Sequence, residues 1–197
     1  MPRPRKEHAQ DTRALALEAA HRLLNQHGYL GVSMDAVADA IGVRKASLYY
    51  HFPEGKEQLI LEIADGVNAQ DASGFAQAIE SATSVRERLL ALARYVIGER
   101  RQSSVVLRDA MRFMTPDHQQ HIYQRFYDGQ YAPLHATLEA GVVSGELRPH
   151  DLTRSAWAFL GLLSEMTTSE DEPSSEPLAQ FIVGLVLDGL SARSSKT

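Results

Sequence analysis

Apolar residues recur with the spacing of α-helices along nearly the whole chain, and this periodicity is the strongest constraint on its fold. The first clear example is the series Leu15, Ala16, Ala19, Ala20, Leu23 and Leu24. Such a series forms one face of an amphipathic helix, and Gly28 is placed to end that helix as a C-terminal glycine. No segment shows a convincing strand-like alternation. The sequence predicts an all-α protein of about nine helices joined by short connections.

Two short helices are predicted after the first one. Ser33 is a suitable N-cap for a helix of about two turns, which Gly42 interrupts. A second short helix is expected from about Lys45 to the Phe52-Pro53 pair, and a longer helix begins at about Lys56. Further helices are expected over residues 85–101, 104–114, 116–143, 151–168 and 176–192. The acidic, Pro- and Ser-containing segment 169–177 is expected to be a loop.

Composition narrows the class of protein. The chain of 197 residues has no cysteine, which excludes disulfides and thiolate metal sites. No apolar run approaches the roughly 20 residues of a membrane span, and the basic N-terminus has no apolar run behind it, unlike a signal peptide. A cytoplasmic protein without membrane contact is therefore expected. The net charge is −5, but residues 1–56 carry +2 and the rest carries −7, as expected for one phosphate-facing end on an acidic body.

The short segment from residue 44 to residue 51 is crowded with hydrogen-bonding side chains. Two short helices around a turn that contains glycine have the layout of a helix-turn-helix. Gly42 can adopt the positive φ of a sharp turn, and Ala38 is small where the two helices cross. A helix that only packs has little use for so many polar side chains, whereas a helix in the DNA major groove needs them. These side chains belong to Arg44, Lys45, Ser47, Tyr49, Tyr50 and His51.

This region resembles the tetracycline-repressor (TetR) family over residues 10–62. The residues that carry the resemblance, in order and at the family's spacing, are Gly28-Tyr29, Ser33, Val37-Ala38, Gly42-Val43, Leu48-Tyr49, His51-Phe52 and Lys56. The Gly-Glu-Leu-Arg turn at 145–148, followed by two apolar helices, is similar to the family in a weaker way. One departure concerns Arg44, which occupies a position where the family often has a small capping serine. The second short helix is therefore expected to begin with a different cap.

The resemblance implies a DNA-binding domain over residues 1–55 and a ligand-binding and dimerisation domain over residues 56–197. It assigns base-edge or nearby contacts to Arg44, Lys45, Ala46 and Ser47, and phosphate contacts to Tyr49, Tyr50, His51 and Lys56. Ser33 joins the DNA-binding set as the cap of the first short helix. A place in the core is an equal alternative for Tyr49, and Phe52 is expected in the core.

The C-terminal helices are too apolar for ordinary surface helices, and a second subunit is the natural cover for a helix that is apolar nearly all round. The resemblance points to a homodimer in which the last two helices of each subunit form a four-helix bundle. The interface residues expected are Phe159, Leu163, Phe181 and Val186. The resemblance also implies a pocket for a small, mostly apolar effector among the middle helices. Its expected lining consists of Met111, Met114, Tyr123, Phe126, Tyr127 and Trp157.

Two other classes of function compete with this interpretation. A helical metal-binding protein is the alternative, because His118 and His121 are three residues apart on one helix with Asp117 beside them. Solvated histidines at a helix start are the commoner explanation. The Glu18-Ala-Ala-His21 segment copies a di-iron motif, but it lies off the apolar stripe and has no second copy. A pure protein-interaction module leaves the polar short helix without a purpose.

No Ser-His-Asp spacing, Walker loop or dinucleotide glycine motif supports catalysis, so the chain is not expected to be an enzyme. The function predicted is a ligand-responsive transcriptional regulator that binds palindromic operator DNA as a homodimer. Repression is expected by analogy, because a dimer without an activating surface covers the promoter that it binds. A small-molecule effector releases it, and neither a metal nor another cofactor is expected.

Overall fold

The computed structural model describes residues 6–99, 110–166 and 175–190, and these residues are helical apart from their turns. The described helices are α1 (Lys6–Gly31), α2 (Met34–Ile41), α3 (Lys45–His51), α4 (Lys56–Glu80), α5 (Val85–Glu99), α7 (Pro116–Phe126), η1 (Tyr127–Tyr131), α8 (Ala132–Ser144), α9 (Leu152–Met166) and α10 (Ser175–Leu190). The all-α prediction is confirmed for this part of the chain. Most of the helix predicted over 104–114 and most of the loop predicted over 169–177 lie outside the described residues.

The chain divides into two compact units, and each is described by itself. The first unit comprises Met1–Val67 and Val105–Ile122, and the second comprises Asn68–Ser104 and Tyr123–Thr197. The helices α4 and α7 each begin in the first unit and end in the second. Within the described residues, no helix is both long and apolar enough to span a membrane.

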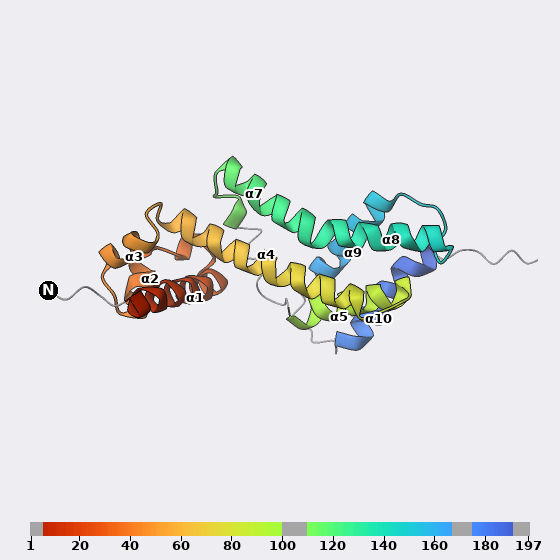
Figure 1. Cartoon of the computed structure of the whole chain (residues 1–197), viewed down its shortest axis with the longest axis horizontal. Helices are drawn as coiled ribbons and strands as arrows, with labels where there is room; N and C mark the ends of the chain where they lie inside the picture. Colours follow the sequence, from red (N-terminus) through yellow and green to blue (C-terminus); the bar gives the residue numbers. More distant parts are fainter. Residues whose placement is uncertain (1–5, 100–109, 167–174, 191–197) are drawn as a thin grey trace, which may run out of the picture. The chain divides into compact units, whose positions relative to one another are not determined.

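The first unit packs α1, α2 and α3 around the beginning of α4 (Figure 1). Gly28 has φ 66° and ψ −175°, so the regular part of α1 ends there as its glycine predicts. The core contains the predicted stripe residues Ala16, Ala20 and Leu24. Leu15 of the same series is half exposed. Residues 110–122 complete this unit by adding buried Ala110, Met114 and Ile122 to the core.

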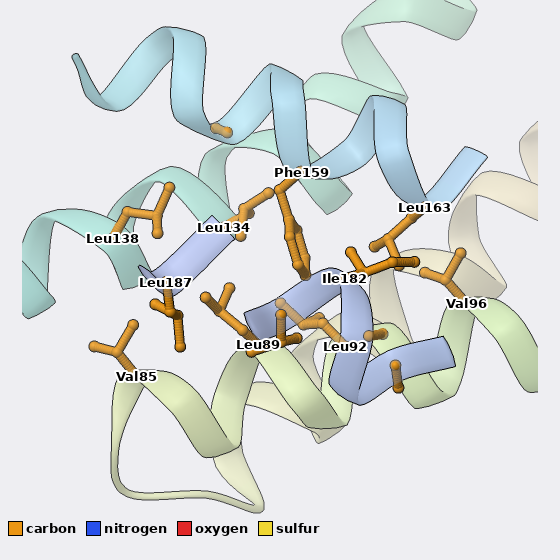
Figure 2. Close-up of a cluster of buried hydrophobic side chains, with 14 of the residues drawn as sticks. Val85, Leu89, Leu92, Val96, Leu134, Leu138, Phe159, Leu163, Ile182 and Leu187 are labelled. Atoms are coloured by element: carbon orange, nitrogen blue, oxygen red, sulfur yellow. The ribbon is translucent and has the colours of Figure 1, made fainter. Parts of the chain in front are cut away.

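The second unit is held together by apolar side chains from four helices, as Figure 2 shows. The helix α5 contacts α10 most extensively, and it also contacts α8 and α9. Phe159 of α9 points into this cluster and is 1% exposed (Figure 2). The labelled side chains around it are Val85, Leu89, Leu92, Val96, Leu134, Leu138, Leu163, Ile182 and Leu187.

The Gly-Glu-Leu-Arg turn closes the second unit between α8 and α9. Gly145 adopts φ 82°, a conformation that glycine tolerates best, and ends α8. Leu147 is buried, and its backbone N–H donates to the carbonyl of Gly141 at 2.9 Å. A carboxylate oxygen of Glu146 accepts a hydrogen bond from the backbone N–H of Val85 at 3.0 Å, which caps the start of α5. The motif therefore has a structural role in joining α8 to α5.

The helix predicted over 116–143 is interrupted by one wider turn, η1, in which the N–H of Ala132 bonds to the carbonyl of Tyr127. Pro133 follows directly and has no N–H with which to continue the α-helical ladder. The wider turn accommodates this proline without ending the helical run. The turn brings Gly129 against α4, where an added Cβ would lie 2.6 Å from the Cβ of Ala72.

Candidate functional site

The turn between α2 and α3 has the geometry that its sequence predicts. The Ser33 hydroxyl accepts a hydrogen bond from the backbone N–H of Ala36 at 3.0 Å and caps α2. Gly42 adopts φ 69°, and the N–H of Val43 donates to the carbonyl of Ala38 at 3.0 Å. Ala38 is buried where α2 meets α3. The predicted helix-turn-helix is thus present, and Ser33 has a clear structural role in it.

The helix α3 is attached to the unit by a single buried residue, Leu48. Phe52 directly follows the helix and is fully buried, as predicted. The side chains predicted to contact DNA lie mostly outside this attachment: Arg44, Lys45, Ala46, Ser47, Tyr49 and Tyr50 are exposed, and His51 is half-buried. Tyr50 is 81% exposed. Most of the polar side chains of this short helix therefore lie on its exposed surface.

The sequence predicts a different cap at the start of α3, and the structure shows that this helix begins without a side-chain cap. Arg44 is the N-cap, but its side chain makes no capping hydrogen bond. Only its backbone carbonyl takes part, by accepting from the N–H of Ser47 at 2.8 Å. The guanidinium is thereby left on the exposed surface. Tyr49 packs over the next turn, with a ring carbon 3.4 Å from the place where a Cβ on Gly55 would lie.

A salt bridge connects the first residue of α3 to α2. The ammonium of Lys45 donates to a carboxylate oxygen of Asp35 at 2.7 Å. The hydrogen bond to this carboxylate is the main cause of a raised pKa for Lys45. Both side chains remain largely exposed.

Lys56 opens α4 on an aromatic surface. Its ammonium lies 3.8 Å from the centroid of the Tyr29 ring, and Tyr29 stacks on Phe113 with centroids 4.9 Å apart. Partial burial lowers the pKa of Lys56. Burial is also the first cause of the raised pKa of Tyr29, followed by the charge of Glu57.

The two histidines of the metal hypothesis bind two different carboxylates. The Nδ1 atom of His118 lies 2.8 Å from an oxygen of Glu57, and Nε2 of His121 lies 2.8 Å from an oxygen of Asp65. The Glu57 carboxylate also accepts from the backbone N–H of Thr115, and this bond is the main reason for its lowered pKa. Among the described residues, no group of three or more His, Asp or Glu side chains is arranged to hold a metal ion. The histidines tie the start of α7 to α4.

The six residues predicted to line an effector pocket are divided between the two units. Met111 and Met114 pack in the core of the first unit. The other four lie in the second unit as part of a connected set of aromatic rings. Trp157 stacks on Phe126 with centroids 5.9 Å apart and lies 5.0 Å from Tyr131. Tyr131 in turn stacks on Tyr127 at 4.9 Å, and Trp157 is 39% exposed.

A buried polar group in the second unit was not found by sequence reasoning. The Gln130 amide donates to the Asn68 side-chain oxygen at 3.4 Å, and the Tyr95 hydroxyl donates to a carboxylate oxygen of Asp71 at 3.3 Å. Asn68, Asp71 and Gln130 are all buried. The sequence contained one signal for this group. Asn68 and Asp71 are polar residues three apart on α4, on a helix face that otherwise carries apolar residues. Polar groups of this kind beside aromatic rings are typical of small-molecule sites.

The structure corrects part of the predicted dimer interface. Phe159 and Leu163 are each 1% exposed, because they pack in the core of their own chain. They therefore have no surface left to offer a partner. Phe181 is 57% exposed and Val186 is half-buried, so both remain available, and Leu185 is 55% exposed. The exposed apolar residues of α10 were separable from the buried ones only once the packing was known.

A family model described as bacterial regulatory proteins, tetR family, matches residues 16–63. The HTH-type transcriptional regulator LmrA of Bacillus subtilis is 38% identical over 77 residues, which are 39% of this chain and 41% of LmrA. The matched segment spans less than half the length of the curated relatives.

Solved structures resemble the chain over nearly all of its length. The TetR family transcriptional regulator PfmR of Thermus thermophilus has a TM-score of 0.73 and 28% identity, covering 90% of this chain and 99% of PfmR. AibR, solved in complex with isovaleryl coenzyme A and operator DNA, has a TM-score of 0.76 and 25% identity, covering 88% of this chain and 97% of AibR.

Proposed function

The chain belongs to the TetR family of bacterial regulatory proteins, and from this premise we propose that it is an effector-responsive transcriptional regulator. It binds operator DNA as a homodimer and represses until a small molecule releases it. Residues 1–55 form the DNA-binding domain, and residues 56–197 bind the effector and pair the subunits. No metal or organic cofactor besides the effector is proposed, and the protein is proposed to act in the cytoplasm, where its operator lies.

The exposed polar surface of α3 is the observation that carries this proposal. One buried leucine holds the helix, and the remaining surface is rich in donors and acceptors. The major groove admits a helix of this kind and displays a different donor and acceptor pattern for each base pair. Arg44, Lys45, Ala46 and Ser47 lie at the start of α3 and are proposed to meet base edges. Tyr49, Tyr50, His51, Lys56 and the Ser33 cap are proposed to meet phosphates.

Selection of duplexes from random DNA by the full chain tests this function. The expected result is a two-fold symmetric sequence, because a symmetric dimer presents two copies of α3. Lys45→Ala is then expected to weaken binding to the selected duplex by about 1–3 kcal/mol, the contribution of a good base contact. Glu139→Ala, an exposed change on α8 in the second unit, is the control and should bind like the wild type. Failure to enrich any sequence would overturn the DNA-reading role.

The exposed apolar residues of α10 support the proposed dimer. Phe181 and Leu185 are four residues apart, which places them on one face of the helix, and each leaves more than half of its surface uncovered. Large exposed apolar patches on a folded domain usually mark interfaces. Val186 extends the same region as a half-buried residue. A second copy of the chain is the proposed cover, since a two-fold dimer also matches a palindromic operator.

The effector is proposed to be a small, mostly apolar molecule that contacts the aromatic rings of the second unit. Tyr123, Phe126, Tyr127 and Trp157 supply apolar ring faces, and the buried Gln130 of η1, which is close to Tyr127 in sequence, donates to Asn68 of α4. AibR was solved with isovaleryl coenzyme A, so short-chain acyl thioesters are the first compounds to test.

The single tryptophan of the chain makes that test direct. Trp157 is the only tryptophan in the sequence, and its ring touches the aromatic set. Titration with isovaleryl coenzyme A is expected to change tryptophan fluorescence and to lower operator affinity about 5- to 150-fold, the usual range of such coupling. Control titrations with free coenzyme A and with free isovalerate distinguish recognition of the carrier from recognition of the acyl group. Binding with unchanged operator affinity would overturn the sensor role.

The alternative of a helical metal-binding protein receives no support from the described residues. His118 and His121 are each engaged with a separate carboxylate on α4. Absence of stoichiometric metal in the purified protein is the expected result of elemental analysis.

A further inference from the structure

The exposed salt bridge between Asp35 and Lys45 has little to contribute to folding. Exposed ion pairs contribute little to protein stability, and α2 is already fastened to α3 by buried Val37, Ala38 and Leu48. The carboxylate of Asp35 nevertheless lies 2.7 Å from the ammonium of Lys45. An acidic residue in contact with the proposed base-reading lysine must influence how that lysine meets DNA.

The pair restricts a side chain that is otherwise a mobile point charge. A lysine ammonium sits on a flexible stem and has three N–H donors. One donor is directed at Asp35, which fixes the position of the nitrogen and leaves two donors for a base edge. Guanine offers two acceptors, O6 and N7, in the major groove. Asp35 therefore prepares Lys45 for a directed contact rather than a diffuse attraction.

The same carboxylate opposes sequence-independent binding. Affinity for DNA of any sequence comes from neutralised phosphates and the counterions they release. Lys45 is partly neutralised by Asp35, so its ammonium is less available to a phosphate. The pair thus weakens nonspecific binding while it retains the donors that read a base.

Given the proposed function on which this inference rests, we propose that Asp35 is a specificity-determining positioning residue. It holds the Lys45 ammonium for base recognition, and it lowers the affinity for unrelated DNA. The ratio of operator to nonspecific affinity depends on both effects.

The sharpest test compares Asp35→Asn with Asp39→Asn. Both residues are exposed on α2, and both substitutions remove one negative charge from the same helix. Among the described contacts of α2, only Asp35 accepts a hydrogen bond from Lys45. Binding is measured by fluorescence anisotropy of the full chain on a duplex selected by the wild type and on a scrambled duplex of equal composition, from about 50 to 200 mM salt, the range over which phosphate contacts change affinity strongly.

Asp35→Asn is expected to lower the affinity ratio of selected to scrambled duplex about tenfold, within the range of one base contact. Its binding to the scrambled duplex should tighten, with a log–log salt slope steeper by about 0.9, because the freed ammonium takes up a phosphate. Asp39→Asn should leave the ratio within about twofold of wild type, since it breaks no contact with the lysine. Asp35→Glu, which keeps the charge, should recover most of the ratio.

The Lys45→Ala variant tests whether Asp35 changes the affinity ratio by acting on Lys45. In that background, Asp35→Asn should no longer change the affinity ratio. A ratio for Asp35→Asn equal to that of wild type or of Asp39→Asn would overturn the inference. A further fall of the ratio in the Lys45→Ala background would also overturn it, by showing that Asp35 itself contacts DNA. If the wild type does not distinguish the two duplexes at all, the proposed function fails instead.

Discussion

The helices α3 and α10 leave opposite kinds of surface uncovered within one chain. On α3, Leu48 is the buried attachment, and the uncovered residues are mostly polar. On α10, a buried row that includes Ile182 and Leu187 packs against the rest of the second unit, and the uncovered face carries Phe181 and Leu185. A polar face on an exposed helix fits a hydrogen-bonding partner such as DNA, whereas an apolar face fits an apolar partner such as a second subunit.

Substitution of a residue in the buried core of the second unit should give the largest effect, a loss of folding stability. Phe159→Ala is expected to destabilise the protein by about 3–5 kcal/mol, because it leaves a cavity in a packed core. Urea unfolding followed by circular dichroism measures this change. Arg154→Ala, on an exposed position of the same helix, should shift stability by less than about 0.5 kcal/mol. A variant Phe159→Ala that is stable but monomeric would mean that the residue serves the interface rather than the core.

Substitutions on the exposed apolar face of α10 should give the next largest effect. They should weaken the association of the subunits and leave folding intact. Phe181→Asp combined with Leu185→Asp is expected to weaken the dimer by at least about 2 kcal/mol, or about 30-fold in Kd, because charges would replace a central apolar contact. Sedimentation velocity over a concentration series measures it. Asp188→Asn on the same helix is the control. An unchanged dimer would place the interface elsewhere.

Lys56→Met tests the proposed DNA-binding surface. It removes the charge of Lys56 and keeps an apolar stem over the Tyr29 ring. Loss of one phosphate contact should reduce the salt slope by about 0.9. Affinity for operator and for unrelated DNA should fall by the same factor, since a phosphate carries no base identity. A loss confined to the operator, seen in anisotropy titrations on both duplexes, would assign Lys56 to base reading.

The smallest effect concerns the exposed ion pair between α5 and α10. Arg94 bonds both oxygens of Glu176, at 2.6 and 2.8 Å. This contact, with a second hydrogen bond from Gln180, lowers the pKa of Glu176 from 4.5 to about 2. Because the pKa of Glu176 is lower in the folded state, the ion pair contributes its full stabilisation above the ordinary pKa of 4.5. This stabilisation is lost as the pH falls toward about 2.

Glu176→Gln should therefore lower the urea midpoint slightly at about pH 7, and the difference from wild type should shrink as the pH falls from 4.5 toward about 2. Glu139→Gln serves as the control, since Glu139 is exposed on α8. Equal midpoints at neutral pH would show that solvent screens the pair completely.

The sequence by itself determined the helical class, the helix-turn-helix and the surface of α3. These features depend on local rules: apolar spacing, the Ser33 cap, and the positive φ of Gly42. A short helix with one apolar anchor has only one way to pack, so its polar residues must face outward. Residue identity was therefore sufficient to predict that Lys45, Ser47 and Tyr50 are exposed. For Tyr49 a place in the core was an equal alternative, and only the packing decided that it is 43% exposed.

Only the tertiary structure decided how the apolar residues of the later helices are distributed. Phe159 and Phe181 are the same residue type on similarly apolar helices, yet one is 1% exposed and the other 57%. The pairing of Lys45 with Asp35, ten residues earlier in the chain, likewise depends on how α2 crosses α3. Hydrophobic burial has no direction, so composition predicts that such residues are covered, but only packing decides whether the cover is the same chain or another.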